Sequence, residues 1–210
     1  PAPEESAAGT GSGSGGPTDS GDGSVGATGT DAEIEDVTLS NADMTYGDSF
    51  NGGGVLVGNN KGTVTNVSAS GAMVVADSGF DAGGLVGINE GTIAYSEADM
   101  DVSDETGNVG NIGGLVGSQQ SGGTIHNSSA TGDVLINDNR VGGLVGSNGQ
   151  FGVAVIRDSY ATGDVEGTSS VGGLAGDQQS FDAVIKRSYA TGSVTGDDAQ
   201  IGGLVGDQSR

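Results

Sequence analysis

The side chains of this chain that could take part in chemistry are mostly carboxylates. Three of them stand one residue before a valine in a repeated phrase: Asp101, Asp133 and Asp164. If successive phrases stack, these carboxylates lie above one another on an outer face, where calcium, which prefers oxygen ligands, could bridge them. We therefore name them as candidate calcium ligands, against the alternative of a solvated ladder of charges that salt screens. No other cofactor is expected.

The residues that most enzymes use are scarce. The chain has one histidine, His126, no cysteine, and six lysines and arginines in total, so few groups could act as a nucleophile or stabilise an oxyanion. Asp133 and Asp164 could form an acid–base pair, but they arise from the repeat and not from a unique cluster. The sequence predicts that the chain is not an enzyme, with a carbohydrate-active β-helix enzyme as a remote alternative.

Two further pairs of residues recur one or two repeats apart. Tyr160 and Tyr189 are expected to stack outward as an aromatic ledge for a sugar or a partner, or simply as a cross-strand pair. Asn66 and Asn127 each begin an Asn-x-Ser sequon at the same repeat position, so both are candidate glycosylation sites.

The most regular feature of the chain is the phrase Gly-Gly-Leu-Val-Gly. It occurs at 83–87, 113–117, 142–146 and 202–206, with alanine for valine at 172–176 and a degenerate first copy at 54–58. Its leucines are 29 or 30 residues apart: Leu56, Leu85, Leu115, Leu144, Leu174 and Leu204. No phosphate-binding lysine or helix follows the glycines. We interpret each copy as the corner of a coil, with an inward leucine and with glycines that supply positive φ.

A second phrase, Ile-x-x-Ser-x-Ala-x-Gly-x-Val, alternates with the first. Its best copies cover 125–134, 156–165 and 185–194, looser ones begin at Val64 and Ile93, and the loosest begins at Ile34. Small or apolar residues alternate with polar ones from the serine onward, which predicts a strand. The step of three residues from isoleucine to serine breaks this alternation. It predicts a corner at Asn127, Asp158 and Arg187.

Each unit of about 30 residues thus holds three short strands that cannot bury an apolar face alone. Stacking the units solves this for all of them, which predicts an all-β parallel β-solenoid of about six coils. A β-propeller fits less well, since it needs about four strands and usually an aromatic residue per blade, and so does a β-sandwich, in which the repeats would be fortuitous. The expected core ladders are the leucines Leu85, Leu115, Leu144, Leu174 and Leu204 with Ile93, Ile125, Ile156 and Ile185, beside columns of alanine (Ala69 to Ala190) and valine (Val102 to Val194).

Composition divides the chain into two parts. Residues 1–31 are rich in Gly, Ser and Asp, and are expected to form a flexible tail or linker, while residues 32–210 form the solenoid domain. No apolar run is long enough for a membrane span. The repeats begin in the second half of a unit and end after the first half of another. We therefore expect copies to stack head to tail into a homo-oligomer, because open solenoid ends expose strand edges.

The charge is strongly acidic, with 28 acidic residues, a net charge of −22 and no basic patch. Nucleic acid is therefore excluded as a partner. Such self-repulsion is tolerable where salt screens it, so we interpret the surface as adapted to high salt, with an acidic and very soluble extracellular protein as the alternative.

The two phrases together resemble the GLUG repeat, over roughly residues 54–206 and in six copies. GLUG repeats occur in large exported bacterial and archaeal surface proteins, including adhesins. The resemblance implies an extracellular or cell-surface β-helical repeat and no catalytic residues. The first half-repeat departs from the pattern, with Leu39 at the alanine position and Asn41 at the glycine position, as in a modified end coil. The leading hypothesis is a filament subunit, and the alternative is an adhesin module that binds glycans or another cell.

Overall fold

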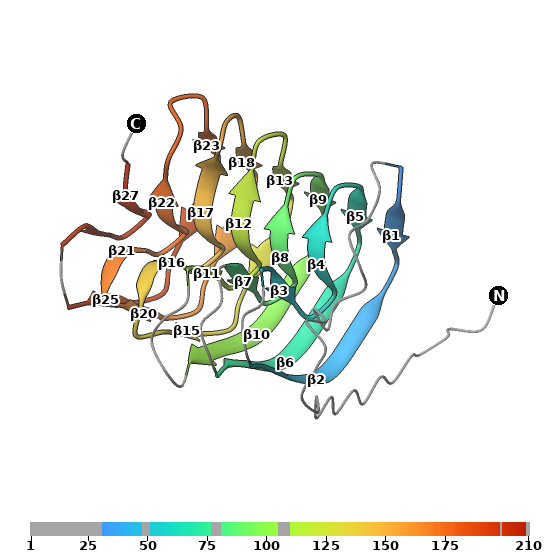
Figure 1. Cartoon of the computed structure of the whole chain (residues 1–210), viewed down its shortest axis with the longest axis horizontal. Coiled ribbons are helices and arrows are strands. Elements are labelled where there is room, and N and C mark those ends of the chain that lie inside the picture. Colours follow the sequence, from blue (N-terminus) through green and yellow to red (C-terminus); the bar gives the residue numbers. More distant parts are fainter. Residues whose placement is uncertain (1–30, 48–50, 77–80, 105–109, 198, 209–210) are drawn as a thin grey trace.

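The described part of the chain is built from strands that stack into a parallel β-solenoid (Figure 1). The structure, a computed structural model, describes residues 31–47, 51–76, 81–104, 110–197 and 199–208. Within these ranges it has 27 strands and no helix, and hence no helix that could cross a membrane. The predicted solenoid is confirmed, whereas the tail predicted over 1–31 lies, apart from its last residue, outside the described residues.

Each coil passes through four sheets in turn, and every strand pairs in parallel with its equivalents in neighbouring coils. The first sheet contains β1 (Glu33–Glu35), β5 (Thr63–Thr65), β9 (Thr92–Ala94), β13 (Thr124–His126), β18 (Val155–Arg157) and β23 (Val184–Lys186). The second contains β2 (Thr38–Tyr46), β6 (Ser68–Val75), β10 (Glu97–Asp104), β14 (Ser129–Ala130), β15 (Val134–Leu135), β19 (Tyr160–Ala161), β20 (Val165–Gly167), β24 (Tyr189–Ala190) and β25 (Val194–Gly196).

The other two sheets carry the glycine-rich phrase. The third sheet contains β3 (Gly53–Gly54), β7 (Asp81–Gly83), β11 (Asn111–Gly113), β16 (Asn139–Gly142), β21 (Ser169–Gly172) and β26 (Ile201–Gly202). The fourth contains β4 (Val57–Asn60), β8 (Val86–Asn89), β12 (Val116–Gln120), β17 (Val145–Gln150), β22 (Ala175–Gln178) and β27 (Val205–Asp207). The prediction of three strands per unit was therefore wrong: the phrase is a corner that joins two strands.

The glycines of this corner are needed for close backbone approach and not for positive φ. A Cβ at Gly83 would lie 2.2 Å from the carbonyl oxygen of Val86, and one at Gly172 would lie 2.0 Å from that of Ala175. Neither glycine has positive φ. The expectation that these glycines supply left-handed conformations was wrong. The chain turns here with backbone carbonyl oxygens packed so close to the glycine Cα atoms that a side chain would not fit.

Left-handed residues instead make the corner between the first and second sheets. Asn127, Asp158 and Arg187 have φ of 53°, 53° and 50°, as the broken alternation indicated. The same corner is left-handed in the earlier coils, at Asp36, Asn66 and Tyr95. One residue in this conformation reverses the inward and outward faces, which accounts for the three-residue step from isoleucine to serine.

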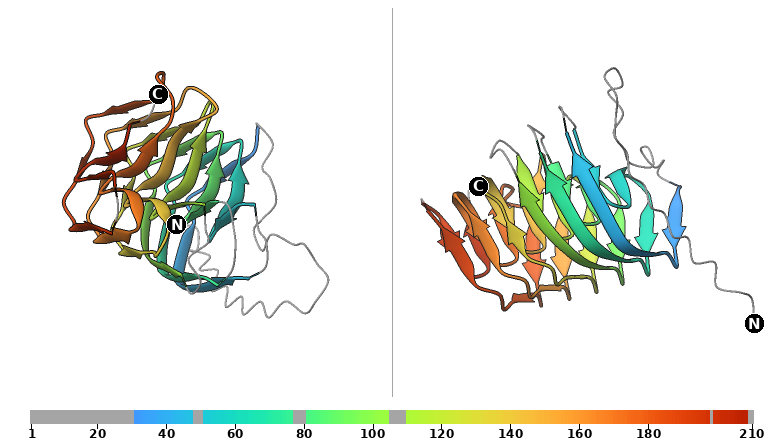
Figure 2. Two further views of the ribbon diagram at one scale, coloured as in Figure 1. Left: turned by 60° about the vertical axis from the view of Figure 1, so that its left-hand side comes forward. Right: turned by 90° about the horizontal axis from the view of Figure 1, so that it is seen from below.

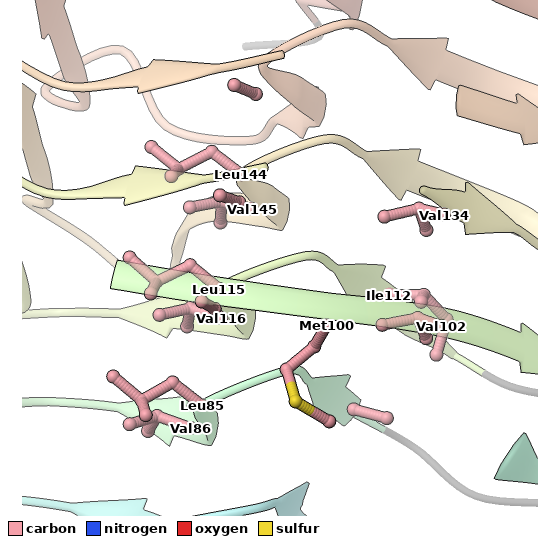
Figure 3. Close-up of a cluster of buried hydrophobic side chains, with 14 of the residues drawn as sticks. Leu85, Val86, Met100, Val102, Ile112, Leu115, Val116, Val134, Leu144 and Val145 are labelled. Carbon is pink, nitrogen blue, oxygen red and sulfur yellow. The ribbon is translucent and has the colours of Figure 1, made fainter. Parts of the chain in front are cut away.

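The core consists of columns of equivalent residues (Figure 3). Figure 3 shows Leu85, Leu115 and Leu144 above one another, with Val86, Val116 and Val145 beside them and Val102 and Val134 facing them. The isoleucine column is in register from Ile93 through Ile185, the alanine column from Ala69 to Ala190, and the valine column from Val102 to Val194. Their inner members are fully buried, whereas Leu204, in the last coil, is 40% exposed.

The first strand of the second sheet contains a bulge. Leu39 pairs with Ala69 as expected, but Ala42 and not Asn41 lies opposite Gly71. Asn41 is the extra residue, in a left-handed conformation with φ of 54°. The placement of Asn41 at the glycine position was therefore wrong by one residue, because an inserted residue shifts the register.

Candidate functional sites

In the aspartate ladder, Asp133 and Asp164 lie where the strand of the second sheet is interrupted, whereas Asp101 lies within β10. Oδ1 of Asp101 accepts a hydrogen bond from the backbone N–H of Asp133 at 3.1 Å, Oδ1 of Asp133 accepts one from the N–H of Asp164 at 2.8 Å, and Oδ1 of Asp164 accepts one from the N–H of Ser193 at 2.8 Å. Each carboxylate therefore replaces a carbonyl as the acceptor that links two coils. The repeat at Asp133 and Asp164 has a structural reason that the sequence did not reveal.

These aspartates are strung along the solenoid and do not converge. Among the described residues, no group of three His, Cys, Asp or Glu side chains is arranged to hold a metal ion. One oxygen of each ladder carboxylate accepts a backbone N–H, and all three aspartates are exposed. Calcium bridging between neighbouring coils stays a prediction.

The left-handed corner carries the shortest ion pair among the described residues. Nε and Nη2 of Arg187 donate to the two carboxylate oxygens of Asp158 at 2.6 and 2.7 Å, across one coil. Nη1 of Arg157 adds a contact at 3.4 Å. The hydrogen bonds from Arg187 lower the pKa of Asp158 to about 2, and the same pairing raises the pKa of Arg187. Consecutive corners can thus be joined by opposite charges.

The sequons and the histidine lie on this same edge. Asn66 and Asn127 are both exposed; Nδ2 of Asn66 donates to Asp36 at 2.6 Å, and Oδ1 of Asn127 lies 3.1 Å from Nδ1 of His126. The ring of His126 packs edge-on against Tyr95, with centroids 5.5 Å apart. Glycosylation at the two asparagines stays a prediction.

Tyr160 and Tyr189 lie on the outer side of the second sheet, on β19 and β24. Their rings are nearly parallel, at 7°, with centroids 5.1 Å apart, and Tyr189 is 52% exposed. They form a flat aromatic surface two coils high. Its use as a ligand ledge stays a prediction.

The sequence analysis missed a ladder of buried amides in the fourth sheet. Its members are Asn60, Asn89, Gln119, Asn148 and Gln178, all less than 9% exposed. Nδ2 of Asn60 donates to Asn89 at 2.8 Å, Asn89 donates to Gln119 at 3.3 Å, and Gln119 donates to Asn148 at 3.3 Å. The signal was present, since each amide stands three residues after the valine or alanine of the glycine phrase. Stacked amides of this kind specify register along a parallel array.

Serines form a second ladder, at the entry to the second sheet. Oγ of Ser128 donates to the carbonyl of His126 at 3.0 Å and accepts from the N–H of Ser96 at 3.2 Å. Ser159 repeats both contacts one coil later. The serine of the second phrase therefore closes the left-handed corner and links it to the preceding coil.

A polar network missed by the sequence analysis crosses from the third sheet to the fourth. Asn111 donates to the buried carboxylate of Asp81, Nη1 of Arg140 donates to Asn111 at 3.4 Å, and Nε of Arg140 lies 3.8 Å from Asp177. Burial raises the pKa of Asp81 to about 6, and burial with the nearby Asp207 raises the pKa of Asp177. The rim of this network, with Phe151, lines a pocket.

The ladders therefore connect equivalent positions of neighbouring coils, and they extend parallel strand pairing through side chains. This arrangement stabilises a stack of coils. The fold and its two alternating phrases define a β-solenoid of repeated motifs.

The comparisons with known proteins agree with this class. The family described as the GLUG motif matches residues 108–135 and 137–166. The resemblance to the GLUG repeat that the two phrases indicated is therefore confirmed over these two adjacent stretches. It is similar to Halomucin from Haloquadratum walsbyi (strain DSM 16790 / HBSQ001), with 41% identity over 86 residues. That match covers 40% of this chain and 1% of Halomucin. No solved structure matches the chain.

Proposed function

We propose that this chain is a non-enzymatic structural module of the cell exterior in a high-salt setting, and that its solenoid is extended end to end into a filament. The net charge of −22 and the likeness to a protein named Halomucin, from Haloquadratum walsbyi, support the setting. The observation that supports the assembly is that, among the described residues, no strand pairs with the outer edges of the four sheets at either end of the stack (Figure 2).

The last coil presents to solvent the same columns that are buried elsewhere. Ile201 and Leu204 are 42% and 40% exposed, while Val171 and Leu174, one coil inside, are fully buried. At the opposite end Ile34, Leu39 and Met44 are only partly buried against the core. Uncovered parallel edges above an apolar column pair readily with another strand layer. A head-to-tail contact of this kind does not close and grows a fibre.

Gly203→Ala tests this assembly with the smallest possible change. At Gly173, the equivalent position one coil inside, a Cβ would lie 2.4 Å from the carbonyl oxygen of Gly203 and 2.9 Å from Ala190 Cβ, both in the following coil. At Gly203 itself nothing lies within 4 Å. The alanine therefore fits the free chain and clashes only when another coil covers it.

Electron microscopy and light scattering in molar NaCl should show rods for the parent chain and dispersed particles for Gly203→Ala, with the same unfolding temperature at low salt. Dispersed parent protein at every salt concentration contradicts the proposal, and so do rods that Gly203→Ala leaves unchanged.

A second candidate function is adhesion through glycans, which the stacked pair Tyr160 and Tyr189 favours. Stacked, exposed aromatic rings offer the apolar face that sugar rings pack on. Binding on a glycan array should be lost in Tyr160→Ala and Tyr189→Ala. Tyr95→Ala is the matched control, because Tyr95 is 61% exposed and lies outside the ledge. Equal binding by all three variants removes this candidate.

A further inference from the structure

The first sheet changes charge along the solenoid. One of its outward lanes runs Glu35, Thr65, Ala94, His126, Arg157, Lys186, and the left-handed corner beside it runs Asp36, Asn66, Tyr95, Asn127, Asp158, Arg187. Its first coil is thus acidic and its last coil basic, with neutral coils between. Acidic residues are common throughout the chain, so the acidic end carries little information. The basic end is unusual, because three of the six lysines and arginines of the chain lie in these two lanes, within the last two coils.

We propose that β1 of a second copy seats on β23 in the register of the interior strand pairs, so that Lys186 meets Glu35 and Arg187 meets Asp36 of the next copy. This rests on the proposed end-to-end assembly and specifies its register. The occupant proposed for the β23 edge, with which no further described strand pairs, is therefore the acidic strand β1 of a second copy of this chain.

The interior of the solenoid already contains such a pair. Arg187 holds Asp158 across one coil through two hydrogen bonds of 2.6 and 2.7 Å. Its guanidinium has five N–H donors and uses two of them here, while its side chain is 62% exposed. Lys186 is exposed, and within the described residues no ion pair engages it. Both cations are available to a carboxylate one coil further on.

The other sheets also match in this register. The aspartate ladder ends at Ser193, so a neutral serine and not a fourth aspartate would face Asp43 of the next copy. In the fourth sheet, Asp207 would face Asn59 and Leu204 would continue the leucine column. At the strand positions that would pair across the contact between two copies, no carboxylate therefore faces another carboxylate. This is so although acidic residues outnumber basic ones by 28 to 6 in the chain.

Salt acts in opposite directions on the two electrostatic terms. Copies that carry −22 each repel one another, and salt screens this long-range repulsion. Ion pairs in contact are separated by about the Debye length of roughly 3 Å at 1 M salt, so salt weakens them less. Association should therefore rise with salt and still depend on Lys186.

The experiment compares charge reversals in one lane. Lys186→Glu and Arg157→Glu make the same change in net charge at paired positions of β23 and β18, but only Lys186 lies at the end. Sedimentation velocity in molar NaCl should show association weakened roughly tenfold by Lys186→Glu, as expected for the loss of an ion pair and its replacement by repulsion. Arg157→Glu should change it less than about twofold. Glu35→Lys combined with Lys186→Glu restores the pair with its order exchanged and should recover parental association.

Each outcome decides one claim. If Lys186→Glu and Arg157→Glu behave alike, or the exchanged pair does not recover, the proposed register is wrong while end-to-end assembly stands. If the parent chain stays monomeric at all salt concentrations, the assembly and its register fall together. Unfolding temperatures of the variants at low salt show that each one is folded.

Discussion

Single residues in this solenoid are dictated mainly by how closely the backbones of successive coils approach. The second glycine of the repeated phrase shows this, because Gly173 and Gly203 occupy the same position in consecutive coils and differ only in whether another coil covers them. Gly173→Ala should destabilise the monomer by about 1–3 kcal/mol through overpacking against a carbonyl, and Gly203→Ala should leave it unchanged. Denaturant unfolding at low salt measures both. Equal effects would show that the loss comes from the intrinsic preference of glycine and not from crowding.

The buried carboxyl of Asp81 should make stability depend on pH. Burial raises its pKa from 3.8 to about 6, so between these values the folded state binds the proton more tightly than the unfolded state does. Stability is then lost as the pH rises from about 4 to about 6. The pKa of Asp158 is lowered to about 2 in the folded state. Its contribution to stability is therefore lost as the pH falls, and this happens below pH 4.

Asp81→Asn should therefore raise stability at pH 7 by about 1–3 kcal/mol and reduce the decline between pH 4 and 6, leaving the part that the raised pKa of Asp177 contributes. The amide can still pair with Asn111. Thermal unfolding of both proteins across pH 3–8 measures the effect, and a decline of undiminished size in Asp81→Asn would assign it to another group.

At the scale of elements, the side-chain ladders hold the strands in register. Gln119 of β12 donates to Asn148 at 3.3 Å and to the carbonyl of Val155 at 3.1 Å, and it accepts from Asn89 at 3.3 Å. Gln119→Leu leaves these partners without their hydrogen bonds to the amide and should destabilise the protein by about 2–4 kcal/mol. Gln120→Leu, the same change at the next and more exposed residue of the strand, should have little effect. Chemical denaturation compares the two, and similar losses would mean that the amide hydrogen bonds contribute little.

The strand columns could be predicted because each follows from one repeated position. Leucine, isoleucine, alanine and valine recur at a fixed spacing. Parallel stacking of the coils then places equivalent residues above one another. The fourth sheet could not be separated from the third, because the corner at Gly84 and Leu85 takes only two residues and its glycines look like turn residues. The left-handed corner between the first and second sheets could be predicted, because it lies where the alternation of small and polar residues breaks.

The polar parts were harder to place. The buried amides of Asn89 and Gln119 look like surface residues in a sequence, since their burial depends on partners in the neighbouring coils. Asp81, Asn111 and Arg140 stand at equivalent positions of successive coils, but the residue type at this position changes from coil to coil. A search for recurring residue types therefore does not detect the network. Only the structure brings those side chains together.

For the whole molecule, the balance between side-chain ladders and net charge should make stability depend on salt. The carboxylates of Asp101, Asp133 and Asp164 are one coil apart, about 4.8 Å along the axis, and repel one another while each accepts a backbone N–H. With a net charge of −22 over the chain, adding NaCl should raise the unfolding temperature as this repulsion is screened.

Substitutions at Asp133 separate its charge from its hydrogen bond. Asp133→Asn keeps an oxygen acceptor for the N–H of Asp164 and removes one charge from the middle of the ladder, so it should stabilise the protein at low salt by a few tenths to about 1 kcal/mol and reduce the salt dependence. Asp133→Ala leaves that N–H without its acceptor and should be less stable than Asp133→Asn at every salt concentration, by about 1 kcal/mol. Melting curves from low to molar NaCl, with and without calcium, measure both effects. If calcium stabilises the parent chain but not Asp133→Asn, that result would instead support metal bridging of the ladder. An unfolding temperature that does not change with salt concentration would contradict the electrostatic account.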